Sequence, residues 1–165
     1  MTRGGRFPDG APCDSGSVVI LTAEDDAGDT VRPRLEAVGA DLARVFVVDG
    51  VRGDGEGDAS RGFNLQHDTA ALGELLNNLI DPALVIVDPL TAFCGRLDSH
   101  RNAEVRAVLA PLAEVAAARD VALLAVSHLT KAAGSDPLLR VTGSLAFTAA
   151  ARGVILVAAD PSDRD

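Results

Sequence analysis

Short, almost wholly apolar runs that end at charged residues are the feature that most constrains the fold of this chain. The run 84–87 stops at Asp88. A second run, 18–22, stops just before the acidic residues 24–26. Runs of this length suit strands that are buried on both faces, as in parallel sheets covered by helices. A carboxylate at the end of such a strand lies where α/β proteins bind their ligands.

Strands and helices are expected to alternate along the whole chain. The expected strands are 18–21, 45–48, 84–88, 121–126 and 154–157, and the expected helices are about 30–38, 72–80, 102–119 and 144–152. A strand as apolar as 121–126 is expected to be covered on both faces. Five strands separated by helices predict an α/β fold with an open, mostly parallel sheet flanked by helices. With 165 residues, the chain suits a single domain, 1–165.

Single residues mark the expected ends of the helices. Asp29 is the expected N-cap of the first helix, and Gly39 is the expected left-handed residue that closes it. Asp68 is the expected N-cap of the second helix. Pro111 falls inside the third helical pattern and predicts a kink in a continuous helix. The glycine-rich, charged segment 50–62 predicts a mobile loop.

Composition excludes several classes of function. The formal net charge is -9 and neither Trp nor Tyr occurs, so the chain lacks the positive field and the stacking platforms of an autonomous nucleic-acid binder. Cys13 and Cys94 lie far apart, which predicts neither a disulfide framework nor a zinc site. No apolar stretch approaches the ~20 residues that a membrane span needs. We expect a soluble, cytoplasmic protein with no membrane partner.

Polar residues at three strand ends are expected to converge, because ligands of such sheets bind at the carboxyl ends of the strands. These residues are Glu24, Asp25 and Asp26, then Asp88, and then Ser127, His128 and Lys131. A strand-end Asp holds Mg²⁺ directly or through water, a Glu orients or deprotonates water, and a His or Lys contacts a γ-phosphate. The cluster therefore predicts a magnesium-phosphate site.

Three of these segments resemble motifs of RecA-like ATPases. Residues 84–90 resemble a Walker B strand, residues 22–26 the acidic strand-end motif, and residues 127–131 the third helicase motif. Further likenesses follow in the same order as far as Arg152. The chain thus resembles the RecA-like P-loop core of the RepA-type hexameric replicative helicases, which are AAA-type ATPases.

The resemblance implies Mg-ATP hydrolysis between the subunits of a ring, coupled to movement on DNA. It implies that Glu24 is the catalytic base, that Asp88 organises the magnesium ion and that His128 senses the γ-phosphate. It also implies that Arg152 reaches into the site of a neighbouring subunit. Nucleotide contacts are implied for Asp25, Ser127 and Lys131.

The phosphate-loop motif G-x-x-x-x-G-K-[ST] of that family does not occur in this sequence. Since the loop and its Lys supply most contacts to the β- and γ-phosphates, we expect this chain alone to bind ATP weakly and to turn over little or none of it. We expect a fragment, a remnant or a late-started form of a longer protein, with DNA bound only by an intact ring-forming parent. The missing strand and helix would leave apolar sheet surface open, which predicts a homo-oligomer or strand exchange.

Two other classes of protein remain open. A phosphoacceptor receiver domain has an acidic pair, a central Asp, a Ser or Thr and a Lys, which residues 24–26, Asp88, Ser127 and Lys131 copy with poor spacing. A metal-dependent hydrolase would use Asp88, Asp98, His100 and His128.

Plainer interpretations of the same residues also remain. On these, Asp88 simply ends a strand in a turn, His128 is a structural histidine and Arg152 is a cation at a helix end. The acidic residues 24–26 would then complement the dipole of the helix that follows them.

Overall fold

A four-stranded sheet with the strand order β4-β3-β7-β8 forms the centre of the molecule. The structure is a computed structural model that describes residues 1–52, 60–96, 102–129 and 145–159. Every neighbouring pair of strands is parallel, which suits a chain that returns through a helix after each strand. The strands are β3 (Ser17–Thr22), β4 (Val45–Val47), β7 (Pro82–Asp88) and β8 (Ala122–Ala125). The predicted α/β fold with a parallel sheet is therefore confirmed.

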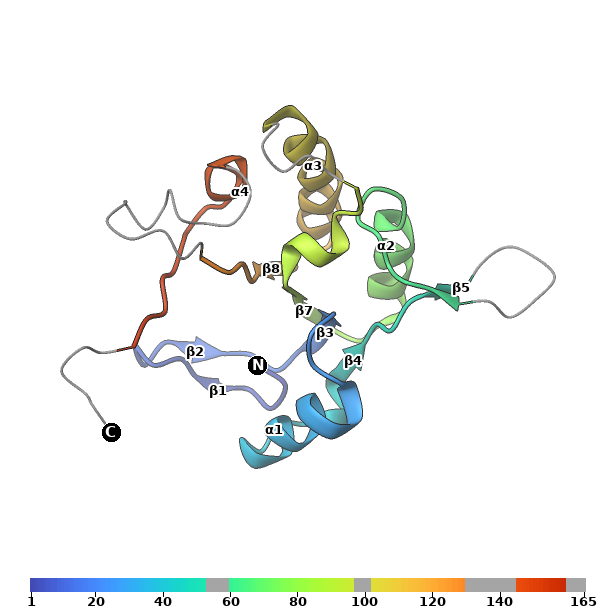
Figure 1. Cartoon of the computed structure of the whole chain (residues 1–165). Coiled ribbons are helices and arrows are strands. Elements are labelled where there is room, and N and C mark those ends of the chain that lie inside the picture. Colours follow the sequence, from blue (N-terminus) through green and yellow to red (C-terminus); the bar gives the residue numbers. More distant parts are fainter. Residues whose placement is uncertain (53–59, 97–101, 130–144, 160–165) are drawn as a thin grey trace.

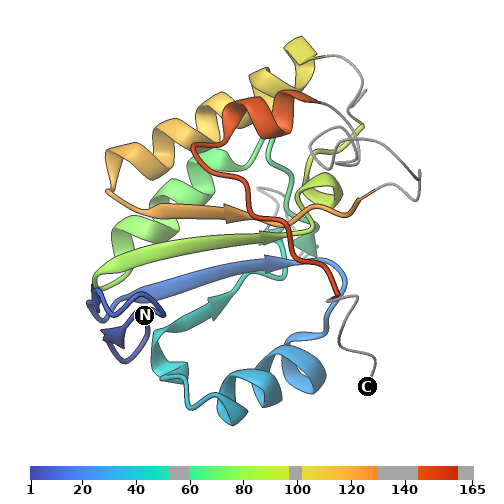
Figure 2. The same ribbon diagram turned by 90° about the vertical axis from the view of Figure 1, so that its left-hand side faces the viewer.

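Two helices pack side by side on one face of this sheet. They are α2 (Thr69–Asn78) and α3 (Asn102–Ala118), seen end-on in Figure 1 and from the side in Figure 2. Successive strand residues point to opposite faces, so β3 and β7 supply alternate residues to one core. These are Val19, Leu21, Val85 and Val87, each at most 1% exposed. The helices contribute Leu72, Leu76, Val105, Val108 and Leu112 to the same core.

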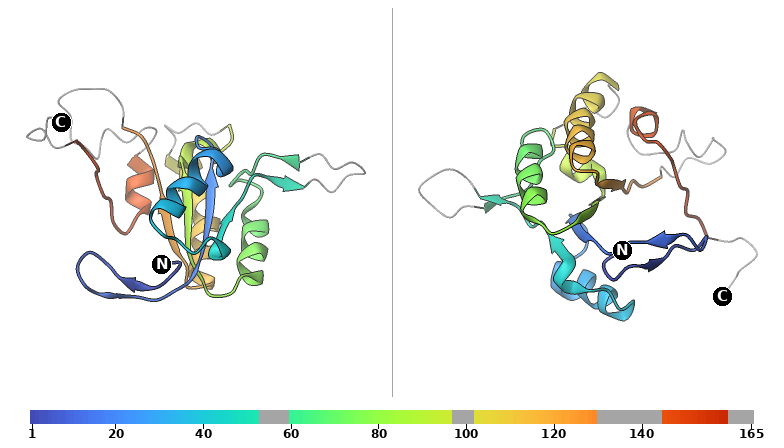
Figure 3. Two further views of the ribbon diagram at one scale, coloured as in Figure 1. Left: turned by 90° about the horizontal axis from the view of Figure 1, so that it is seen from below. Right: turned by 180° about the vertical axis from the view of Figure 1, so that it is seen from behind.

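The other described elements are short. A π-helical turn η1 (Ala27–Val31) and α1 (Arg32–Ala37) follow β3, and a 3-10 turn η2 (Leu42–Arg44) leads into β4. The hairpin of β5 (Val51–Arg52) and β6 (Ser60–Arg61) precedes α2, and a 3-10 turn η3 (Leu90–Phe93) follows β7. Helix α4 (Leu145–Ala150) lies against α3. The N-terminal hairpin of β1 (Gly5–Arg6) and β2 (Pro12–Cys13) lies on the opposite side of the sheet from α2, as Figure 3 shows.

Several connections follow the expectations from sequence. Gly39 has a φ of 70° just after α1, the left-handed conformation that glycine adopts without strain. Helix α3 continues through Pro111. Asp81 and Asp120 precede β7 and β8 with φ values of 48° and 52°, which short polar side chains tolerate better than most. The chain thus enters both β7 and β8 after an Asp residue with a positive φ.

Of the two predicted aspartate N-caps, Asp29 is wrong, whereas Asp68 occupies the predicted N-cap position without making a side-chain cap bond. The first helical segment is capped by Asp26, whose carboxylate accepts hydrogen bonds from the backbone N–H groups of Gly28 and Asp29. Asp29 therefore contributes a backbone N–H donor to the cap, and its side chain is not the capping group. Asp68 precedes α2 but makes no cap bond, because its carboxylate is engaged by Arg61.

The prediction of a fifth strand at 154–157 is also wrong. Within the described chain these residues form no strand, and Ile155 and Val157 are 86% and 88% exposed. The expectation that 121–126 is covered on both faces fails too, since Leu123 and Leu124 are 38% and 46% exposed. Among the described strands, β8 is at the edge of the sheet and pairs with β7 alone.

The segment 50–62, predicted to be a mobile loop, begins and ends in paired strands. Val51 pairs with Arg61, and Arg52 pairs with Ser60. Residues 53–59 of the segment lie outside the described residues. Among the described helices, none combines the length and the apolar character that crossing a membrane would require.

Candidate functional site

The carboxyl ends of β3 and β7 lie next to each other. Thr22 and Asp88 are register partners in the parallel ladder, and the backbone N–H of Ala23 donates a hydrogen bond to the carbonyl oxygen of Asp88 at 3.0 Å. This bond extends the pairing one residue beyond β3. Glu24 therefore leaves the sheet beside Asp88.

Strand β8 brings the third predicted group to the same edge. Val87 of β7 pairs with Ala125 of β8, and the backbone N–H of Val126 donates a hydrogen bond to the carbonyl oxygen of Val87 at 2.9 Å. Ser127 and His128 follow directly. The convergence that the strand pattern predicted for residues 24, 88 and 128 is thus present in the structure.

Glu24 and His128 meet across the end of β7, although 104 residues separate them in sequence. The Nε2 atom of His128 lies 3.0 Å and 3.3 Å from the two carboxylate oxygens of Glu24. Both side chains are more than half exposed, at 60% and 55%. An exposed pair of this kind contributes little to stability, so its main effect is to orient the two side chains.

Asp88 is a carboxyl group of the site whose pKa is raised. Its burial raises its pKa above the ordinary 3.8, and the negative charges of Glu24 and Asp25 raise it further. His128 acts in the opposite direction. Carboxylates held close together repel one another, and a divalent cation relieves that repulsion.

The three consecutive acidic residues after β3 have three different partners. Glu24 contacts His128, whereas the carboxylate of Asp25 accepts a hydrogen bond from Arg34 of α1 at 2.8 Å. The carboxylate of Asp26 caps η1, and these backbone hydrogen bonds lower its pKa. Only Glu24 of the three therefore reaches the third strand end.

Ser127 has a buried hydroxyl group at this edge. Its Oγ atom has no hydrogen-bond partner among the residues that the structure describes. Such a group is uncommon in native proteins and usually has a functional or solvent explanation. It lies one residue from His128 and so belongs to the same strand end.

The remaining predicted site residues are Lys131, Asp98, His100 and Arg152. Lys131, Asp98 and His100 lie outside the described residues. Arg152 follows α4, is exposed, and makes no ion pair within the described chain.

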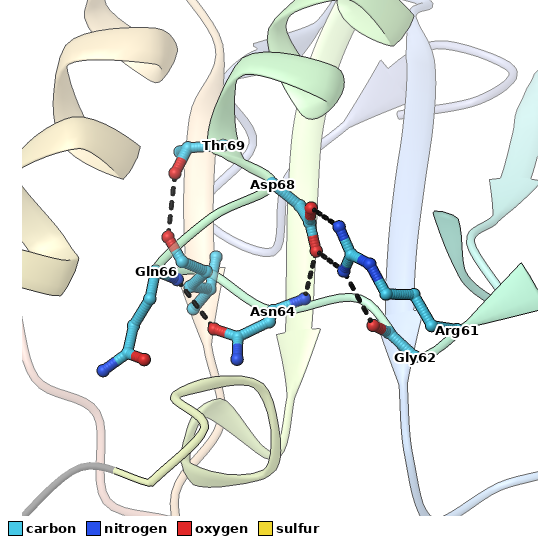
Figure 4. Close-up of polar contacts among 7 residues, drawn as sticks. Arg61, Gly62, Asn64, Gln66, Asp68 and Thr69 are labelled. Atoms are coloured by element: carbon cyan, nitrogen blue, oxygen red, sulfur yellow. Dashed lines mark hydrogen bonds and ion pairs between the residues drawn. The ribbon is translucent and has the colours of Figure 1, made fainter. Parts of the chain in front are cut away.

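A second polar cluster, which sequence reasoning missed, lies between β6 and α2 (Figure 4). Arg61 donates hydrogen bonds from both terminal guanidinium nitrogens to the two carboxylate oxygens of Asp68, each at 2.6 Å. The backbone N–H of Asn64 donates to the same carboxylate at 2.8 Å. The Asp68 side chain is only 4% exposed, and the Arg61 hydrogen bonds hold the pKa of Asp68 below 3.8.

The loop that contains the Arg61–Asp68 cluster is linked to the turn that follows β7. The backbone N–H of Leu65 in this loop donates to the carbonyl oxygen of Phe93 in η3 at 2.8 Å. Turn η3 directly follows Asp88 and Pro89. No pattern in the sequence marks this ion pair, because an Asp before an apolar helix is equally expected as a helix cap.

The donor set fits a weakly caged magnesium ion better than a protein-enclosed metal. In the described ranges no group of three or more His, Cys, Asp or Glu side chains is arranged to hold a metal ion. Mg²⁺ is commonly bound through one or two carboxylates, with waters and phosphate oxygens as its other ligands. Asp88 and Glu24 are carboxylates of that kind. Asp98 and His100, two of the four predicted ligands of a metal-dependent hydrolase, lie outside the described residues.

One comparison with known protein families gives a match. A family model described as an AAA domain matches residues 1–134, which include Glu24, Asp88 and His128 but not Arg152. The match gives no support to the receiver domain or to the metal-dependent hydrolase. A comparison with curated proteins finds no match.

Proposed function

Because the chain belongs to this AAA domain family, we propose that the carboxyl edge of its sheet is the water-activating part of a Mg-ATP hydrolysis site. Nucleotide and magnesium binding are general properties of the family. The observation that carries the proposal is the contact of Glu24 with His128 beside Asp88, at the carboxyl ends of three neighbouring strands. Each strand thus contributes one side chain suited to this chemistry.

Glu24 is the proposed general base. Its carboxylate is exposed and oriented, so it can accept a proton from water at the edge of the sheet. A carboxylate whose orientation is already fixed loses less conformational entropy in positioning itself to accept a proton than a freely rotating carboxylate does. His128 supplies the orientation through Nε2 and is the proposed contact of a γ-phosphate oxygen.

Asp88 is the proposed magnesium-organising acid. Its raised pKa arises from burial and from neighbouring negative charge, both of which a divalent cation would offset. A bound Mg²⁺ supplies charge neutralisation to the phosphate oxygens of ATP. The Ser127 hydroxyl, which is buried and unpaired in the described chain, is the proposed donor to a phosphate oxygen or to a magnesium-bound water.

The finer assignments belong to the same proposal. We propose that the protein is related to replicative helicases of the RepA type, on the strength of the ordered motifs from residue 22 to Arg152. In a ring of such subunits, Arg152 would act in the site of the neighbouring subunit, and the ring would move along DNA. Asp25 and Lys131 are proposed as secondary nucleotide contacts, although Asp25 would first have to release Arg34. The chain alone is proposed to have little or no turnover.

Binding of Mn²⁺ with and without ATP, measured by electron paramagnetic resonance, tests this proposal without requiring turnover. Mn²⁺ replaces Mg²⁺ in such sites and gives a direct signal. The variant Asp88→Asn should weaken Mn²⁺ binding by at least about tenfold, because the carboxylate proposed to organise the ion is neutralised. The matched control is Asp120→Asn, which removes one charge at the start of β8, at the opposite edge of the sheet. Equal Mn²⁺ affinity of the two variants would contradict the proposal.

A further inference from the structure

The loop 62–68, which joins β6 to α2, is closed by a single buried side chain. The carboxylate of Asp68 accepts two hydrogen bonds from Arg61 of β6 and one from the backbone N–H of Asn64 (Figure 4). The backbone N–H of Asp68 in turn donates to the carbonyl oxygen of Asn64 at 2.8 Å. Hydrogen bonds between charged partners are roughly twice as strong as neutral ones, and the two parallel bonds of an Arg also fix its direction. Asp68 therefore holds the loop in one conformation against β6.

The loop contacts the turn η3 and the residues after it at two places. The backbone N–H of Leu65 donates to the carbonyl oxygen of Phe93 in η3 at 2.8 Å. Gly95, just after η3, packs against the side chains of Asn64 and Gln66. A Cβ atom at Gly95 would lie 2.6 Å from the amide nitrogen of Asn64 and 3.1 Å from Oε1 of Gln66, so the two segments approach too closely for a side chain to fit between them.

Turn η3 in turn connects the ends of β7 and β8. It begins at Leu90, two residues after Asp88. The backbone N–H of Leu90 donates to the carbonyl oxygen of Val126 at 2.9 Å, and Ser127 is the next residue of the chain. The position of η3 therefore constrains the backbone on both sides of the candidate site, at Asp88 and at Ser127.

We propose that Asp68 is a positioning residue for the carboxyl-edge site: through the loop 62–68 and η3, it holds the end of β7 in place against the end of β8. It acts through these segments and not by contact with a ligand. The inference rests on the proposed function, because the placement of Asp88 and Ser127 matters for binding only if they hold a cation and a phosphate. Residues one layer behind the ligands of a metal commonly change its affinity, since they orient the ligands.

The connection is rigid enough to transmit a change at Asp68. The side chains of Leu65, Leu90 and Phe93 are all buried in the core, at 1%, 4% and 7% exposure. Close-packed interiors have few voids, so a shift of one buried segment displaces its neighbours. A carboxylate oxygen must lie ~2.1 Å from Mg²⁺ to bind it directly. A displacement of Asp88 by a fraction of an ångström would therefore alter cation binding.

Mn²⁺ affinity, measured by electron paramagnetic resonance, tests the effect on the site. Asp68→Asn should raise the Mn²⁺ dissociation constant by about 3- to 30-fold, because the hydrogen bonds that hold the loop lose their charged acceptor. Arg61→Lys should raise it by a smaller factor, since it leaves the net charge unchanged but lacks the planar fork that engages both carboxylate oxygens. Unchanged affinity in both variants, together with weak binding by Asp88→Asn, would overturn this inference and leave the proposed function intact.

Two control variants separate position from charge and from stability. Asp120→Asn removes one negative charge at the start of β8 and should leave the Mn²⁺ dissociation constant nearly unchanged. Leu76→Ala opens a cavity in the core beside α2, where Leu76 is 2% exposed, and should lower stability without changing the constant. An affinity that falls as far in Leu76→Ala as in Asp68→Asn would show a loss of stability alone, and would overturn the inference.

Hydrogen exchange of the Leu90 amide gives a second test that needs no metal. Asp68→Asn should speed exchange at Leu90 at least about tenfold more than at Ser17, whose amide is hydrogen-bonded at the start of β3. Leu76→Ala should speed both amides alike, through global unfolding. Equal acceleration of both amides in Asp68→Asn would overturn the inference. If Asp88→Asn binds Mn²⁺ as tightly as the unaltered chain, the proposed function fails, and the exchange at Leu90 decides by itself whether Asp68 holds the turn.

Discussion

Asp68 and Asp88 are two carboxyl groups near the same edge of the sheet that the protein treats in opposite ways. Asp68 is 4% exposed and holds a two-bond ion pair with Arg61, so its pKa is lowered. Asp88 is partly buried among other acids, so its pKa is raised. The first arrangement favours the charged form and stabilises the fold. The second disfavours the charge unless something else neutralises it, which is typical of a binding or catalytic site.

The largest expected effect comes from Asp68→Asn. The substitution keeps the shape of the side chain but removes the charge that Arg61 and the Asn64 N–H contact. We expect the free energy of unfolding to fall by about 1–3 kcal/mol, as measured by urea titration. The control Asp29→Asn changes an exposed acid and should have an effect below about 0.5 kcal/mol. Equal changes in the free energy of unfolding for Asp68→Asn and Asp29→Asn would show that Asp68 is not a stabilising acid, and would remove its contrast with Asp88.

The two acids should respond to pH with opposite signs. Asp68 has a lowered pKa in the folded chain, so its contribution to stability is complete above 3.8 and is lost as the pH falls through the lowered value. Asp88 has a raised pKa, so the folded chain holds that proton more tightly, and stability falls as the pH rises from 3.8 through the raised value. We expect Asp68→Asn to remove the rise of the free energy of unfolding with pH, and Asp88→Asn to remove the fall. Urea titrations of both variants over a pH series measure this. The same slope in both variants would contradict the assignment.

At neutral pH, Asp88→Asn should stabilise the fold while it weakens divalent-cation binding. Removal of the charge relieves burial and repulsion from Glu24, so we expect a gain of up to about 1 kcal/mol in the free energy of unfolding. A gain in stability with a loss of binding is the usual trade-off at functional sites. A loss of stability in urea titrations at pH 7 would place Asp88 with Asp68, as a structural acid.

The smallest effect is expected at the Glu24–His128 contact. Both side chains are more than half exposed, so Glu24→Gln and His128→Gln should each change the free energy of unfolding by less than about 0.5 kcal/mol. A double-mutant cycle should give a coupling below about 1 kcal/mol. A coupling as large as the effect of Asp68→Asn would mean that the contact is there to hold the fold together.

The sequence was sufficient for the strand ends because they follow from local patterns. An apolar run that stops at an acid marks both the end of a strand and the edge where ligands bind, so the convergence of Glu24, Asp88 and His128 was predictable. The partners of Asp25 and Asp68 were not, because Arg34 and Arg61 reach them through tertiary or loop geometry. Side-chain partners several residues away leave no periodic signal in a single sequence.

Strands β7 and β8 show that burial also could not be predicted from the sequence alone. Both are apolar, yet Val85 and Val87 of β7 are at most 1% exposed while Leu123 and Leu124 of β8 are 38% and 46% exposed. An apolar run predicts that a strand forms, but its coverage depends on which elements lie beside it. The same reason explains why 154–157 forms no strand in the described chain, since a strand exists only with a partner to pair with.

Paramagnetic broadening of the His128 imidazole resonances by Mn²⁺ tests the central claim most directly, namely that three strand ends form one cation and phosphate site. The variant His128→Gln identifies the resonances in the proton spectrum. We predict that Mn²⁺ broadens them strongly in the unaltered chain, and that the broadening is largely lost in Asp88→Asn and kept in Asp120→Asn. Resonances of His128 that stay sharp at Mn²⁺ concentrations where the ion is bound would show that it binds elsewhere, and would contradict this account.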